Sequence, residues 1–83
     1  DLMQVGRILN ATRTLGKSQG YIGLPVRDET INCSIGGEDT PSMVTAWHPT
    51  PTELAAINAG APIHVRIIGT AHPPIMVEVG KTP

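Results

Sequence analysis

The chain has 83 residues with 6 basic and 7 acidic side chains, a net charge of −1, a single cysteine, and Trp47 and Tyr21 as its two aromatic residues. This length predicts one domain (1–83), and the lone Cys33 excludes an internal disulfide. The absence of a Lys/Arg cluster argues against DNA or RNA as a partner, and no apolar run approaches the roughly 20 residues that cross a membrane.

The first segment of the chain gives two conflicting signals. Val5, Ile8 and Leu9 have helical spacing, whereas the residues that follow alternate between apolar and polar side chains and are rich in threonine. We favour a strand over residues 8–15 and a flexible turn over residues 16–20.

Proline and glycine then divide the chain into short extended pieces. Residues 21–28 predict an edge strand or an extended segment, because Pro25 lacks the N–H that a central strand needs. Residues 30–35 predict a short strand, and the glycine- and proline-containing residues 36–41 predict a loop. Residues 42–47 alternate again and predict another strand.

A helix is indicated by signals at both of its ends. Thr50 can serve as the N-cap, Pro51 occupies the first helical position, and Glu53 completes a capping box. Gly60 supplies the left-handed residue that ends a helix. The sequence therefore predicts a short capped helix over residues 51–59.

Two alternating segments close the chain. Residues 63–67 and 75–79 each place apolar side chains at every second position, and residues 69–74 join them, which predicts an antiparallel hairpin. Together the elements predict an α+β domain with a small antiparallel sheet of about four to six strands and one helix. The helix and the two strands after it are the clearest part of this pattern.

The core of such a domain is expected to be thin. Trp47 is the expected anchor, with Leu54 and Ile57 facing the core from the helix. A chain of this length buries only about 60–65% of its unfolded surface, and without a disulfide its usual supplement is association with other copies. We therefore predict a homo-oligomer.

Residue patterns of catalytic and metal sites are missing. The histidines are too widely spaced for the short pairs typical of zinc sites, and no nucleophile motif surrounds Cys33, which favours an inert, partly buried thiol over a nucleophile. The acidic pairs 28–29 and 38–39 resemble solvated loop charges. The sequence predicts a protein that is not an enzyme, with no metal and no cofactor. A cysteine without a disulfide partner is also typical of a reducing compartment. The three histidines that were considered as metal ligands are His48, His64 and His72.

Binding has more support than catalysis. An arginine can hold a phosphate or carboxylate in a bidentate grip, a histidine adds a directional hydrogen bond, and an indole can stack on a base. A stiff loop that contains two prolines lowers the ordering cost of the polar groups it presents. Each candidate also has a structural interpretation: a solvated charge, a core anchor or a rigid turn. The candidate ligand-binding residues are Arg27, Trp47, His64, Arg66, Thr70 and His72.

Three segments carry a resemblance to a known group of proteins. They read WHPTPTEL (47–54), NAGAP (58–62) and GTAHPP (69–74), and they resemble small proteins encoded in tailed phages and prophages. These three segments contain 19 of the 83 residues, and a weaker match lies at residues 23–28. The resemblance implies a phage setting, the cytoplasm of a bacterial host, and a short gene of the kind that disarms host defences, in one strategy by a compact oligomer that sequesters a nucleotide signal.

The sequence therefore leads to two expectations. The first is a non-catalytic, homo-oligomeric, phage-type protein that captures a small anionic, nucleotide-like ligand. The alternative is a protein–protein interaction module, either an inhibitor of a host protein or a minor structural component of the phage.

Overall fold

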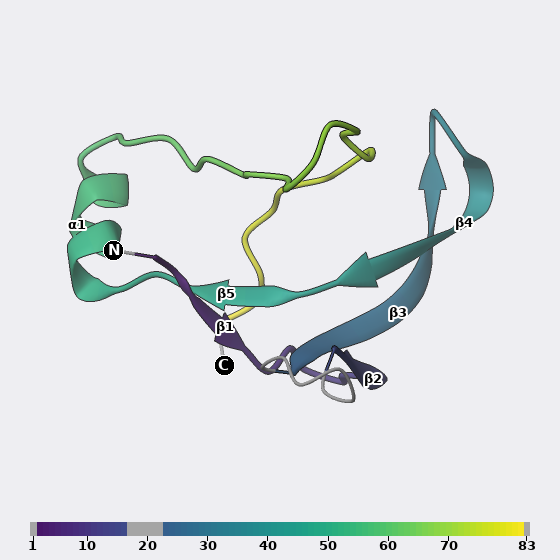
Figure 1. The fold of residues 1–83 in the computed structure, drawn as a ribbon, viewed down its shortest axis with the longest axis horizontal. Coiled ribbons are helices and arrows are strands. Elements are labelled where there is room, and N and C mark those ends of the chain that lie inside the picture. Colours follow the sequence, from purple (N-terminus) through teal and green to yellow (C-terminus); the bar gives the residue numbers. More distant parts are fainter. Residues whose placement is uncertain (1, 17–22, 83) are drawn as a thin grey trace.

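The structure of the protein is a computed structural model that describes residues 2–16 and 23–82. Five strands and one helix follow one another in the order β1 (Gln4–Gly6), β2 (Arg13–Leu15), β3 (Leu24–Cys33), β4 (Gly37–Val44), β5 (Ala46–His48) and α1 (Pro51–Asn58). Figure 1 shows β3 and β4 as a long hairpin on one side, α1 on the other, and β5 crossing β1 between them. The fold is α+β, as the sequence predicted.

Three strands form one antiparallel sheet in the order β2-β3-β4. Thr14 lies opposite Pro25, and the ladder between β3 and β4 begins only at Arg27, opposite Val44. The proline is therefore tolerated because the second edge of β3 is still free at that point. The strands predicted at 21–28 and 30–35 are one strand, β3, although Tyr21, Ile22 and most of the predicted turn lie outside the described residues.

The predicted loop over residues 36–41 is wrong. Only the turn around Gly36 is a loop, and β4 begins at Gly37, which has a φ of 84°. The strand also includes Pro41, opposite Thr30. Since β4 is an edge strand, it tolerates a proline whose missing N–H faces solvent. Pairing with β3 has outweighed the local turn signals.

The remaining strands form a separate two-stranded sheet, in which β1 pairs with β5 through Val5 opposite Trp47 and Gly6 opposite Ala46. A Cβ on Gly6 would collide with the imidazole of His48, so a larger residue would require that ring to move. The strand predicted over residues 42–47 is divided after Val44, because β4 pairs with β3 and β5 pairs with β1.

The strand predicted over residues 8–15 is correct only at its end. Residues 13–15 form β2, whereas the stretch before it turns at Asn10, which has a φ of 60°. The Ala11 N–H donates to the Ile8 carbonyl across this turn at 3.2 Å. Asparagine tolerates the left-handed conformation better than most residues, and the turn leaves Ile8 buried.

The capped helix is confirmed. Thr50 Oγ1 accepts from the Glu53 N–H at 3.2 Å, and a Glu53 carboxylate oxygen accepts from the Thr50 N–H at 2.8 Å. At the other end, the Gly60 N–H donates to Ile57 and the Ala61 N–H donates to Ala56, both at 2.9 Å. This pair of bonds is the Schellman arrangement, and Gly60 has the required positive φ of 101°.

The interior of the molecule is smaller than predicted. Ile8 and Val26 are its buried apolar side chains among the described residues, and Val26, at 1% exposure, is the most enclosed. No residue of α1 is buried, and Leu54 is exposed, so the expectation that the helix faces a core is wrong. Trp47 is 51% exposed and is not the core anchor.

The predicted C-terminal hairpin is also wrong. Residues 61–82 form neither strand nor helix, and Figure 1 shows them arching away from α1 and returning to end near β1. All of their side chains are exposed except Ile67, which is half-buried. The alternating pattern is present, but among the described residues these segments have no strand to pair with.

Candidate functional site

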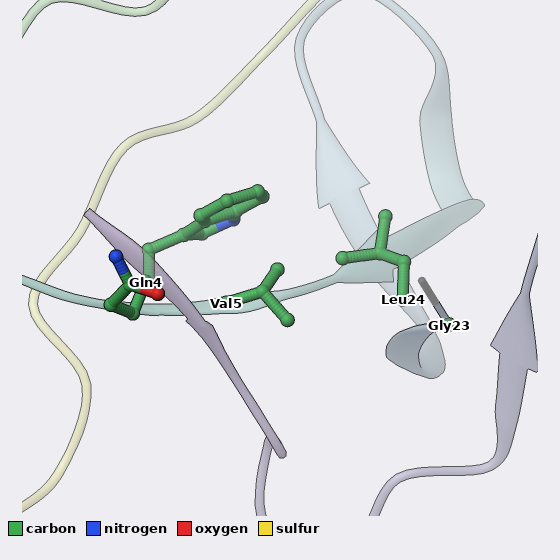
Figure 2. A pocket seen from close by; sticks show the side chains of 5 residues that line it. Gln4, Val5, Gly23 and Leu24 are labelled. Atoms are coloured by element: carbon green, nitrogen blue, oxygen red, sulfur yellow. The ribbon is translucent and has the colours of Figure 1, made fainter. Parts of the chain in front are cut away.

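A shallow, open hollow lies beside the β1–β5 sheet. Because Val5 and Trp47 are directly opposite in the antiparallel register, their side chains occupy the same face of that sheet. Gln4 completes this wall, and Gly23 and Leu24, at the start of β3, form the other. Figure 2 shows Val5 and Leu24 on facing sides of the space, which has a volume of about 460 Å³.

Trp47 is the one candidate residue that lines this hollow. Its indole N–H donates to Thr45 Oγ1 at 2.9 Å, so its polar group is already satisfied. The ring is nevertheless 51% exposed. A half-exposed indole with a satisfied N–H presents mainly its apolar faces, which are the surfaces that stack on planar ligands.

Arg27 lies within β3 and is engaged elsewhere. Its Nε donates to Glu29 Oε2 at 2.9 Å, and its Nη1 donates to the Leu9 carbonyl at 3.0 Å. These bonds attach the turn before β2 to the middle of β3. To bind a ligand, Arg27 would have to exchange at least one of these bonds for a contact with an anion.

The other four candidates lie on residues 61–82 and are exposed: His64, Arg66, Thr70 and His72. The alternating pattern predicted that His64 and Arg66 lie on one face of a strand. Because residues 63–67 form no strand, that prediction is wrong. His72 Nδ1 lies 2.8 Å from the Pro73 carbonyl. No hydrogen bond or ion pair joins any two of the six candidates, all of which are described.

A polar cluster that the sequence did not reveal connects β2 to β3. Arg13 donates to both carboxylate oxygens of Asp28, at 2.9 and 3.0 Å, and the Thr12 hydroxyl donates to Asp28 Oδ2 at 2.6 Å. The Asp28 N–H donates back to Thr12 Oγ1 at 2.9 Å. The hydrogen bonds from Arg13, and then those from Thr12, hold the pKa of Asp28 below its ordinary value, and the same carboxylate raises the pKa of Arg13.

The interpretation of residues 28–29 as loop charges is therefore wrong, although both side chains are exposed, as expected. Both lie inside β3, and both carboxylates are paired, Asp28 with Arg13 and Glu29 with Arg27. The missing signal was the register of β2 against β3, which places Arg13 opposite Val26, two residues from Asp28. Nothing within either segment alone indicates that register.

Cys33 ends β3 and is half-buried. Backbone N–H groups of Gly36 and Ile35 in the following turn donate to its sulfur, the latter at 3.4 Å, and they lower the pKa of the thiol. Donors of this kind favour the thiolate. The partly buried position agrees with the expectation, and the tuned pKa is an additional finding.

Two further findings concern the described residues as a whole. They contain no cluster of three or more His, Cys, Asp or Glu side chains arranged to hold a metal ion. None of their helices has both the length and the apolar character needed to traverse a membrane.

No protein family, curated protein or solved structure matches this chain. The geometry of the chain itself therefore carries the functional argument.

Proposed function

We propose that this protein is a non-catalytic, phage-type binding protein that captures a small anionic, nucleotide-like ligand between copies of itself. The observation that carries the proposal is the half-exposed Trp47 ring on the wall of a mainly apolar hollow. Its volume of about 460 Å³ falls within the roughly 300–1,000 Å³ of sites that hold small organic molecules. A purine or pyrimidine ring fits such a wall by stacking.

The anionic part of the ligand needs cations that the hollow does not contain. Its lining residues carry no charge, and Arg27 is engaged with Glu29. Arg66 makes no hydrogen bond or ion pair with another described residue and is exposed, so its guanidinium is available for a bidentate grip on phosphate. His64, Thr70 and His72 lie on the same stretch of chain. The proposal assigns these groups to a site completed by a neighbouring copy.

Trp47 provides a direct assay because it is the only tryptophan. Titration of the full chain with a panel of cyclic and linear nucleotides is expected to quench its fluorescence, with saturation and a matching thermal shift. Loss of one base–indole stack in Trp47→Leu, measured by calorimetry, is expected to weaken binding about tenfold or more. Arg66→Ala should also weaken it, whereas Arg7→Ala, which removes an exposed arginine outside the proposed site, should not. Absence of quenching and thermal shift across the panel would refute the proposal.

A mixing experiment tests whether the site is shared between copies. Trp47→Leu and Arg66→Ala chains are each expected to bind poorly. After they are unfolded and refolded together, mixed oligomers contain one site with both native residues, so part of the binding should return. Binding that stays as poor as in either variant alone would place both residues in a site within one chain.

The exposed apolar side chains of residues 61–82 favour a second candidate, a protein–protein interaction module. Capture of the tagged full chain from host lysate is expected to recover a stoichiometric protein that survives high salt if this candidate is correct. A nucleotide released by denaturing the purified protein, and identified by mass spectrometry, would instead support the ligand-binding proposal.

A further inference from the structure

Residues 61–82, called the arm from here on, have the sequence of strands without the pairing of strands. No backbone hydrogen bond joins residues 62–82 to another described residue. Yet residues 63–67 and 75–79 alternate as strands do when one face is covered. Apart from the half-buried Ile67, their apolar side chains are exposed instead, up to 99% at Val79. The arm therefore carries an apolar row that the described residues of this chain leave largely uncovered.

The surface area of the whole chain indicates how much is uncovered. A compact monomer of 8.8 kDa exposes about 4,800 Å² by the usual scaling, whereas this chain exposes 7239 Å². Its radius of gyration is 14.4 Å, against about 12 Å for a compact chain of this length. If two copies each covered this excess surface, they would together bury about 4,900 Å², which lies within the range of obligate homodimers.

The sheet beside the hollow is the surface that most needs a partner. The β1–β5 sheet has two strands with three residues each, and no further strand among the described residues pairs with either of its outer edges. A two-stranded sheet is only marginally stable in water unless a further strand or a packed face supports it. The half-buried Val5 and the half-exposed Trp47 also line the open hollow next to Leu24 with apolar surface. An added strand would satisfy the free backbone groups and cover these side chains.

We propose that the occupant is a second copy of this chain: the arm of each copy adds a strand to the β1–β5 sheet of the other. In this reciprocal exchange the apolar row of the arm packs against Val5 and Trp47. The exchange also brings Arg66 and His72 of one copy toward Trp47 of the other. The inference rests on the homo-oligomeric part of the proposed function, which it deepens by naming the surface. It does not depend on the ligand.

Light scattering coupled to gel filtration, without nucleotide, tests the exchange over a range of protein concentrations. The full chain is expected to have twice the 8.8 kDa monomer mass at high concentration. Trp47 emission should shift to shorter wavelength as the dimer forms. Hydrogen exchange of residues 62–82 should slow at the same concentrations, because the arm acquires backbone partners only in the dimer.

Val77→Asp and Met76→Asp form a matched pair in the arm. Both residues are exposed in the single chain, at 62% and 72%, so neither substitution removes a core contact. Val77 belongs to the alternating row, and its burial in both copies predicts that Val77→Asp raises the dimer dissociation constant at least about tenfold. Met76 lies on the opposite face, and Met76→Asp should change the constant less than about threefold. Circular dichroism should show the parent fold for both.

Three outcomes would overturn the inference: a monomer mass at every concentration, an arm that exchanges rapidly in the dimer, or equal weakening by the two substitutions. A dimer with a protected arm that binds no nucleotide would sustain the inference and remove only the proposed ligand. Nucleotide binding by a chain that stays monomeric would overturn the inference. It would leave the ligand of the proposed function in place but remove the shared site.

Discussion

Helix α1 and the arm adjoin each other, and both have sequence patterns that indicate regular structure, but only the helix forms it. The helix satisfies its hydrogen bonds within one short segment, from the Thr50–Glu53 capping box to the Gly60 turn. It does so while burying none of its residues. The arm has a clear strand alternation, and beyond Ala61 none of its residues forms a backbone hydrogen bond with another described residue.

The difference follows from where each element finds its hydrogen-bond partners. A helix residue bonds to a residue four positions away, so its partner is always supplied by the same segment. A strand residue bonds to another strand, whose location the alternation does not specify. The two regions therefore respond differently to substitutions, and four predictions test that difference.

The largest effect is expected where paired strands enclose a side chain. Val26→Ala removes the most buried side chain of the described residues and should lower the free energy of unfolding by about 2 kcal/mol. In denaturant titrations the transition should shift, and β3 and β4 should lose hydrogen-exchange protection. Met76→Ala is the matched control, because Met76 is 72% exposed and lies on the face of the arm opposite the alternating row. Equal destabilisation by the two substitutions would show that the arm is folded in the monomer.

The helix is expected to respond less strongly and only locally. Thr50→Ala removes the N-cap oxygen and should reduce helix stability by about 1 kcal/mol. Because α1 has no buried residue, the sheets should keep their exchange protection while helical circular dichroism falls. Thr52→Ala, in the same turn but without the cap contact, should have little effect. Loss of β3 protection in Thr50→Ala would reveal a coupling between the helix and the sheet.

A smaller effect is expected at the exposed Arg13–Asp28 pair, and it should depend on pH. Hydrogen bonds from Arg13 and Thr12 lower the pKa of Asp28 in the folded protein. The carboxylate therefore contributes stability above its unfolded pKa of about 4, and this contribution is lost as pH falls through the lower folded pKa. Asp28→Asn should flatten this acid limb of the unfolding free energy. Asp39→Asn, which changes an exposed carboxylate at a positive φ that asparagine tolerates, should leave the limb unchanged.

The smallest change in stability is expected at Cys33, whose reactivity is the useful measurement. Because N–H groups of Gly36 and Ile35 lower the thiol pKa, its alkylation rate should rise at lower pH than that of an ordinary cysteine near pH 8.5. The same chain in denaturant, where the turn is lost, provides the control. Identical profiles for folded and unfolded protein would show that the turn does not stabilise the thiolate.

The helix could be predicted from the sequence and the strand pairing could not, because helix partners are local and strand partners are not. The helix bounds were predicted to within one residue because Thr50, Pro51, Glu53 and Gly60 act on their near neighbours. The β3–β4 hairpin was missed because Pro41 and the neighbouring glycines signal a loop, while the pairing that overrides them involves residues such as Thr30, from another segment. The alternating pattern of the arm is real, but the hairpin within the chain that was predicted from it is wrong.

The candidate site was predictable in its residue types and not in its arrangement. Trp47 was selected for its aromatic ring, and its exposure depends on how little packs over β5, which the sequence does not show. Arg27 was selected for its charge, yet the strand places Glu29 on the same side, two residues away, where it pairs with the arginine. The Arg13–Asp28 pair was missed because it depends on the register of β2 against β3, which neither segment indicates by itself.

The β4 strand has one more consequence, which concerns how assembly stops. A strand of eight residues at the edge of a sheet is a template on which further chains can grow without limit. Here Pro41 removes a donor from that edge, and Glu38 and Asp39 place like charges along it. These residues disfavour a fibre built through β4. In a reciprocal exchange, by contrast, the arm of each copy pairs with the β1–β5 sheet of the other copy. No arm is then left to recruit a third copy, so the assembly stops at a closed dimer.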